Sequence, residues 1–159
     1  MKRFSFILIT LFALIFSCKD EDILFSSHIE TEGAWLKNEA IAASLEFYES
    51  PIDIYLIFKL NEDYPFSNIY LLSSIKNSDL KITDTISFKF DYSKNENLLS
   101  RQMRIKTFRI PIYKGMNLTE RTLVEISHAV RFIDSTEPVK KLEGILDVGI
   151  LVNKSNEEI

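Results

Sequence analysis

Hydrophobic and polar residues alternate along much of this chain, and the alternation predicts β-strands. The clearest case is the segment 52–60, in which large apolar side chains occupy every second position. Successive side chains of a strand point to opposite faces of a sheet, so this period of two predicts a strand with one strongly buried face. The same pattern predicts seven strands, at residues 40–48, 52–60, 66–75, 82–92, 103–112, 123–132 and 145–152.

Polar turn signals separate these strands and indicate the fold class. They lie at residues 50–51, 61–63, 76–79, 93–97 and 135–138. Short strands joined by polar turns are typical of antiparallel sheets, because parallel strands need long crossover connections. We therefore predict an all-β domain, an antiparallel β-sandwich of about seven strands that is immunoglobulin-like or jelly-roll-like. Pro111 predicts a sheet edge or a strand end at its position, because proline cannot donate to the ladder.

The segment 119–132 is the one place where a helix competes with a strand. Leu123, Ile126 and Val130 have partial helical spacing after Thr119. The same stretch also alternates strictly, from Thr122 through to residue 132, and β-branched residues dominate the alternating positions. Because such residues favour strands, we predict a strand here.

The first residues of the chain have the organisation of an export signal. Lys2 and Arg3 precede an apolar run from Phe4 to Phe16, which is too short to span a bilayer but suits a secretory signal core. The run ends at Ser17 and Cys18, and Ile15-Phe16-Ser17-Cys18 resembles a bacterial lipobox. The resemblance implies cleavage between Ser17 and Cys18 and acylation of Cys18. The alternative is an ordinary secretory signal with a chance cysteine.

These signals divide the chain into four parts. We predict a signal peptide at 1–17, a lipidated cysteine and polar tether at 18–33, the β-sandwich at 34–153 and a disordered tail at 154–159. The acyl chains of Cys18 would anchor the domain in outer-membrane lipid, since two or three chains give a stable anchor whereas a single chain binds only reversibly.

The residues directly after Cys18 indicate the face of the membrane on which the domain lies. Lys19, Asp20 and Glu21 resemble the export signal of lipoproteins displayed on the surface of gliding-type bacteria. The alternative is a solvated leader of no special function. On this resemblance we favour the surface face over the periplasmic face.

Composition excludes several classes of partner and of structure. The formal net charge is −4, and the basic residues form no run, which argues against nucleic acid as a partner. A single cysteine excludes an intrachain disulfide. With only four glycines and four prolines in 159 residues, low-complexity structure is also excluded.

The residues that usually carry catalysis or bind metals are scattered here. His28 and His128 are far apart, with no second histidine or thiol at ligand spacing, so we expect no metal and no cofactor. His128 lies on an alternating segment and is expected in the core or in a cross-strand pair. Seven acidic residues give no pair of defined separation: Asp53, Glu62, Asp63, Asp84, Asp134, Glu143 and Asp147. We expect no enzymatic activity, although scattered carboxylates leave a hydrolase open.

Aromatic residues offer a second candidate chemistry. Trp35, Tyr64 and Tyr70, together with Tyr55 and Tyr113, would form a platform for stacking sugars or for docking a protein if they were exposed. The alternative for Trp35 is a structural role, in which it plugs one end of the sandwich.

Three segments carry a resemblance to a known family. They are the blocks 61–71 and 142–150, and Asp84-Thr85 at the start of a strand. With Trp35 and the Cys18 lipobox, they resemble the gliding motility lipoprotein family, GldH, over the whole mature chain. The chain departs from the family pattern at 93–104, which contains no glycine or tryptophan.

The resemblance implies both a role and an architecture. It implies an outer-membrane lipoprotein needed for gliding and tied to the type IX secretion pathway. Because no catalytic constellation is found, we predict a non-catalytic subunit or assembly factor of that machinery; the alternative is a surface glycan-binding lipoprotein that uses exposed aromatic residues. Tyr64-Pro65 suggests an extended turn, and Gly144 and Gly149 suggest a tight turn and a bulge or close backbone approach near Asp147.

Two short tripeptides concern modification rather than architecture. Thr85 and Ser135 lie in sequences that resemble an O-glycosylation motif used on exported proteins of this bacterial group.

Overall fold

The computed structural model describes residues 23–90, 98–102, 104–132 and 136–155. These residues form eleven strands: β1 (Ile23–Glu30), β2 (Ala34–Leu36), β3 (Ile41–Leu45), β4 (Ile52–Leu60), β5 (Asn68–Lys76), β6 (Lys81–Lys89), β7 (Leu98–Gln102), β8 (Ile105–Met116), β9 (Thr122–His128), β10 (Lys141–Glu143) and β11 (Ile145–Lys154). In this described part of the chain there is no helix long and apolar enough to cross a membrane.

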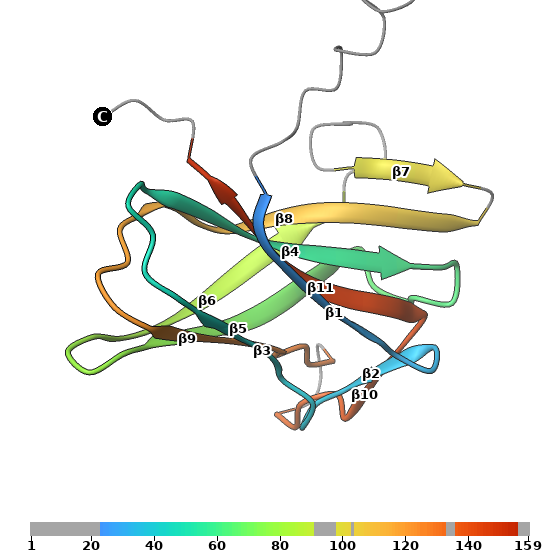
Figure 1. Cartoon of the computed structure of the whole chain (residues 1–159). Helices are drawn as coiled ribbons and strands as arrows, with labels where there is room; N and C mark the ends of the chain where they lie inside the picture. Colours follow the sequence, from blue (N-terminus) through green and yellow to red (C-terminus); the bar gives the residue numbers. More distant parts are fainter. Residues whose placement is uncertain (1–22, 91–97, 103, 133–135, 156–159) are drawn as a thin grey trace, which may run out of the picture.

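The strands build two packed sheets, which confirms the antiparallel β-sandwich (Figure 1). One sheet has the order β1-β11-β4-β8-β7, and the other has the order β3-β9-β5-β6. A small third sheet, β10-β2, lies at one end of the sandwich. All pairings between neighbouring strands are antiparallel. The seven predicted strands correspond to β3, β4, β5, β6, β8, β9 and β11.

Alternating apolar residues fill the space between the two sheets. Leu56 and Phe58 of β4 are fully buried, as are Leu71 of β5 and Val124 of β9 in the opposite sheet. Aromatic rings fill one part of this core, with Phe90 at 4.9 Å from Phe108 between ring centroids. Each fully buried side chain of this size contributes about 1.5–3 kcal/mol, so the inner faces hold the sheets together.

The sandwich extends beyond the predicted limits of residues 34–153 at both ends. Ile23–Glu30 was assigned to a polar tether, but it forms β1 and pairs along β11. Without β1, the outer edge of β11 would leave its backbone groups unpaired, and β1 satisfies them. At the other end β11 continues to Lys154, and the Ser155 N–H donates to the Pro51 carbonyl at 2.8 Å. The short strands β2, β7 and β10 were also missed.

The segment 119–132 contains a strand, as its alternation predicted. β9 covers Thr122–His128 and lies between β3 and β5, so it is a central strand. Every second side chain from Thr122 to His128 is fully buried, which a helix would not achieve with this sequence.

Pro111 lies within β8 and does not end it. β8 continues to Met116, while β7 pairs only with Ile105–Phe108. Among the described residues, β8 is therefore an edge at Pro111, where a missing N–H costs no ladder bond. The edge prediction is confirmed.

Candidate functional site

The two longest sequence blocks meet at one end of the sandwich, together with the segment around Trp35. We call this end the junction and define it as residues 33–36, 61–67 and 142–144. The Asn61 N–H donates to the Gly144 carbonyl at 2.9 Å, and the Gly144 N–H donates to the Gly33 carbonyl at 2.9 Å. Trp35 of β2 pairs in register with Leu142 of β10. Backbone hydrogen bonds therefore join three segments that are far apart in the sequence.

Gly144 is the tightest point of the junction. Its φ is +78°, in the left-handed region that favours glycine, and a Cβ there would lie 2.2 Å from the Tyr64 nitrogen. A register shift follows between Ile145 and Asp147, and a Cβ on Gly149 would lie 3.0 Å from the Ser27 carbonyl oxygen. The predicted tight turn, bulge and close backbone approach are confirmed.

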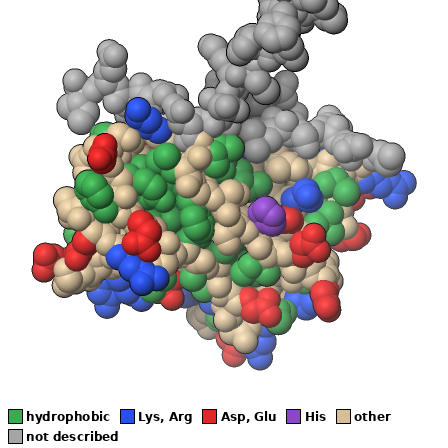
Figure 2. Space-filling model, in the orientation of Figure 1, with side chains coloured by type: hydrophobic (Ala, Val, Ile, Leu, Met, Phe, Trp, Pro, Cys, Tyr) green, Lys and Arg blue, Asp and Glu red, His purple; other side chains and the backbone are tan. Residues whose placement is uncertain are grey.

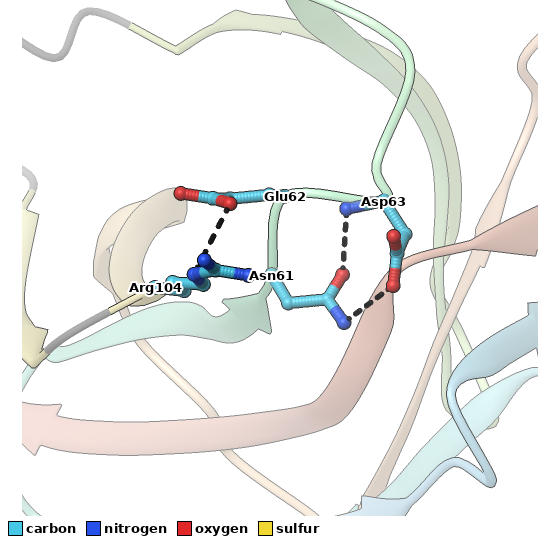
Figure 3. Close-up of polar contacts among 4 residues, drawn as sticks. All are labelled: Asn61, Glu62, Asp63 and Arg104. Carbon is cyan, nitrogen blue, oxygen red and sulfur yellow. Dashed lines mark hydrogen bonds and ion pairs between the residues drawn. The ribbon is translucent and has the colours of Figure 1, made fainter.

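A polar turn lies on the outside of the junction, between β4 and β5 (Figure 3). The Asn61 side chain accepts from the Asp63 N–H at 3.0 Å and donates to the Asp63 carboxylate at 2.9 Å. Arg104, directly before β8, lies 3.6 Å from the Glu62 carboxylate. Both members of this ion pair are largely exposed, so it contributes less than about 1 kcal/mol. The turn is shaped by Asn61, while the ion pair adds little.

The predicted aromatic platform is wrong for Trp35 and Tyr64, because both rings are buried. Trp35 is 3% exposed, and its indole N–H donates to the Glu39 carbonyl at 2.6 Å. Tyr64 is 8% exposed, and its hydroxyl donates to the Asn68 carbonyl at 2.9 Å. Each ring thus buries its apolar area and satisfies its polar atom. The alternative role for Trp35, plugging one end of the sandwich, is confirmed.

The other tyrosines do not join Trp35 and Tyr64 either. Tyr70 is 42% exposed on the four-stranded sheet. The Tyr113 hydroxyl lies 2.9 Å from the Ser73 hydroxyl, in a contact between the two sheets. Tyr55 lies under the Arg109 guanidinium, 4.0 Å from ring centroid to Cζ. Tyr55, Tyr70 and Tyr113 therefore lie apart from the junction, and all of the five aromatic residues except Tyr70 are used in internal contacts.

His128 is a core residue, as predicted. Its side chain is fully buried, with its ring centroid 5.4 Å from that of Trp35 in an edge contact. Burial, helped by the positive charge of Lys37, lowers the pKa of His128 to about 4, although the Trp35 backbone opposes the shift slightly. Neither ring nitrogen has a hydrogen bond of good geometry. His128 is therefore neutral at pH 7 and serves packing.

Asp53 is a buried carboxylate that the sequence did not single out as a structural centre. Burial alone would raise its pKa, but hydrogen bonds from the Gly115 N–H, Ser155 and Tyr55, with the charge of Lys114, lower the pKa below its ordinary value. The Gly115 N–H lies 2.9 Å away and the Tyr55 hydroxyl 3.1 Å away. The available signal was a carboxylate between two large apolar residues, Ile52 and Ile54, at the start of a strand.

The remaining carboxylates belong to different parts of the surface. Glu143 pairs with Lys141 at 3.0 Å, and Asp84 lies on β6 beside the exposed Thr85, whose N–H donates to it at 2.7 Å. In the described residues, no group of three or more His, Cys, Asp or Glu side chains is arranged to hold a metal ion.

Several predicted residues lie outside the described residues. They are Ser17 and Cys18 of the lipobox, the export signal Lys19, Asp20 and Glu21, the acidic Asp134 and the modification site Ser135.

Comparison with known proteins gives one family. A family model described as GldH lipoprotein matches residues 24–152. The gliding motility lipoprotein GldH of Flavobacterium johnsoniae is 25% identical over 155 residues, covering 96% of this chain and 97% of that protein. A GldH homolog of Christiangramia forsetii is 25% identical over 158 residues, with the same coverage of each. With 96% of this chain covered, both matches extend beyond the residues of the sandwich.

Proposed function

This chain belongs to the GldH lipoprotein family, and we propose that it is a non-catalytic subunit or assembly factor of the gliding motility and type IX secretion machinery. Membership of a lipoprotein family suggests a membrane-anchored location in the cell envelope, which this proposal requires. The anchor would be Cys18 in outer-membrane lipid, with the domain on the surface face. The observation that carries this proposal is the family match, which covers nearly the whole sandwich.

The use of the candidate residues supports a non-catalytic role. At the junction, Trp35 and Tyr64 are packed in the core and Gly144 allows two backbones to meet. His128, the one buried histidine, is held neutral by its surroundings and has no carboxylate partner to orient it. Catalytic histidines and carboxylates need a shared, accessible site, and these side chains instead stabilise the fold.

The position of β1 relative to the anchor supports a membrane-proximal role. β1 begins five positions after Cys18, and a fully extended chain of that length reaches about 18 Å at most. The acylated cysteine would thus keep the domain next to the membrane. Confinement of this kind raises the effective concentration of nearby partners, so each protein contact can be weak.

Replacing Cys18 by alanine tests the proposal. We expect Cys18→Ala to release the protein from the membrane fraction and to abolish gliding and type IX secretion in the host, while the melting temperature of the purified domain stays unchanged. Ser87→Ala, an exposed position on β6, is the matched control and should retain both activities. Full gliding and secretion with an unlipidated protein would contradict the proposal.

A further inference from the structure

A groove lies beside β1, at the end where this strand approaches β2. It has a volume of about 530 Å³ and is lined by both apolar and acidic residues. Its apolar part is formed by Ile29, Leu36 and Ala40, and its acidic part by Glu30, Glu32 and Glu39. Figure 2 shows acidic side chains gathered over the same end of the face. The groove therefore combines an apolar surface with negative charge.

The edge of β1 borders this groove and is open in the described part of the chain. β1 pairs with β11 on one side only, so the backbone N–H and C=O groups of its other side are available. Its exposed large side chains are Ile23, Leu24 and Ile29, at 54%, 39% and 45%. An open edge flanked by apolar side chains can accept an additional strand.

One edge strand of the other sheet, β6, differs in having features that oppose strand addition. Lys81 and Lys89 lie at its two ends, and Asp84 pairs in register with the buried Ser73, which places a charge on the inner face. Terminal lysines and inward-pointing charges are typical of edges that natural proteins protect. β1 contains no lysine, arginine or proline. Of these two edges, β1 is the one suited to pairing.

Charge indicates the chemistry of the occupant. In the described part of the chain, no basic side chain forms an ion pair with Glu30, Glu32 or Glu39, while Lys141 of the groove is paired with Glu143 at 3.0 Å. The groove is thus net negative, which favours a cationic ligand and disfavours anionic lipid headgroups. The short connection from Cys18 to β1 keeps this edge within reach of other membrane-anchored envelope proteins.

We propose that this groove binds an extended segment of a partner protein, rich in basic and apolar residues, which adds a strand to the free edge of β1. The backbone of the segment pairs with β1, its apolar side chains contact Ile29 and Leu36, and its basic side chains face Glu30 and Glu32. This inference rests on the proposed function, because it describes how the subunit would hold its partner.

Peptide binding to the full-length lipoprotein in non-ionic detergent tests the proposal. The probe is a fluorescent, acetylated peptide of alternating lysine and valine, matched in length to β1, and its counterpart of alternating glutamate and valine is the reference. We expect the lysine peptide to bind at least about tenfold more tightly, and Glu30→Lys/Glu32→Lys to remove about tenfold of that affinity. Hydrogen exchange should show new protection of the β1 amides.

A matched double variant separates the groove from the overall negative charge. Glu49→Lys/Asp79→Lys changes the net charge equally at two exposed positions away from the groove, and we expect less than about a twofold effect. Equal weakening by both double variants, or protection of amides outside β1, would overturn the proposal. Concentration-dependent dimerisation that protects β1 without peptide would overturn it as well. Failure here, with co-purification of the envelope complex intact, would leave the proposed function standing.

Discussion

The junction and the β1 edge are built in opposite ways, although each contains apolar and polar side chains. At the junction, Trp35 and Tyr64 are buried with their polar atoms satisfied, and Gly144 lets two backbones touch. At the β1 edge, Ile23 and Ile29 remain exposed beside unpaired backbone groups, and Ile29 lines the acidic groove. The difference indicates that the junction specifies the fold, whereas the β1 edge is available for a partner.

Gly144→Ala should break the junction and gives the largest expected effect. Residue 144 has a φ of +78°, and the new Cβ would lie 2.2 Å from the Tyr64 backbone nitrogen. One of these two backbone segments would therefore have to move. We expect destabilisation of about 5 kcal/mol or more, enough to prevent folding in a domain of ordinary stability. Gly115→Ala is the control, because its φ is +61° but nothing lies within 4 Å. It should cost only about 1 kcal/mol in urea unfolding, and equal costs would contradict the steric argument.

Trp35→Ala should remove the aromatic plug from the same end of the sandwich. Loss of a buried tryptophan leaves a cavity beside Phe58 and His128, and we expect a cost of about 3–5 kcal/mol in the free energy of unfolding. Tyr70→Ala, at an exposed aromatic, should change stability by less than about 0.5 kcal/mol. The comparison is made by urea denaturation of the two variants. Similar losses would show that burial does not distinguish these aromatics.

Acidic pH should lower the free energy of unfolding through protonation of His128. Because the folded pKa of about 4 lies below the ordinary 6.5, the folded protein binds fewer protons than the unfolded chain between these values. The stability associated with neutral His128 is therefore complete above pH 6.5 and is lost as the pH falls toward 4, by about 2–3 kcal/mol. His128→Phe should flatten this part of the profile. A variant with the unchanged slope would show that another group is responsible.

Charge reversal at the β1 edge should have the smallest effect on stability. Glu30 and Glu32 are exposed, so Glu30→Lys/Glu32→Lys should change the free energy of unfolding by less than about 0.5 kcal/mol. The same variant should lose affinity for the basic peptide. Thermal denaturation beside the binding assay measures both quantities, and a strongly destabilised variant would show that these residues belong to the fold.

Local alternation was sufficient to predict the central strands but not the sheet edges. β4 and β9 were found because their buried positions recur strictly at every second residue, as at Leu56, Phe58, Val124 and Ile126. β1 was missed because serines and His28 interrupt its apolar residues, which an edge strand tolerates. β2 and β10 have three residues each, and these segments form strands only by pairing with each other.

The candidate site was less predictable than the fold, because a local sequence pattern does not reveal contacts between distant segments. The glycines and the Tyr64-Pro65 turn were identified one by one, and their local roles were anticipated. That Gly144 touches Tyr64, and that Trp35 pairs beside Leu142, depends on contacts between segments distant in sequence. The burial of Trp35 and Tyr64 and the groove beside β1 follow from those contacts, so no single segment contains them.

The most direct test of the central claim, a non-catalytic envelope subunit, is what the protein binds in its own membrane. Tagged full-length lipoprotein would be purified from detergent-solubilised host membranes beside Cys18→Ala, and the co-purifying proteins quantified by mass spectrometry. We expect motility or secretion proteins in stoichiometric amounts with the wild type and their loss with Cys18→Ala. Recovery of the wild-type lipoprotein alone, from cells that glide and secrete normally, would contradict the claim.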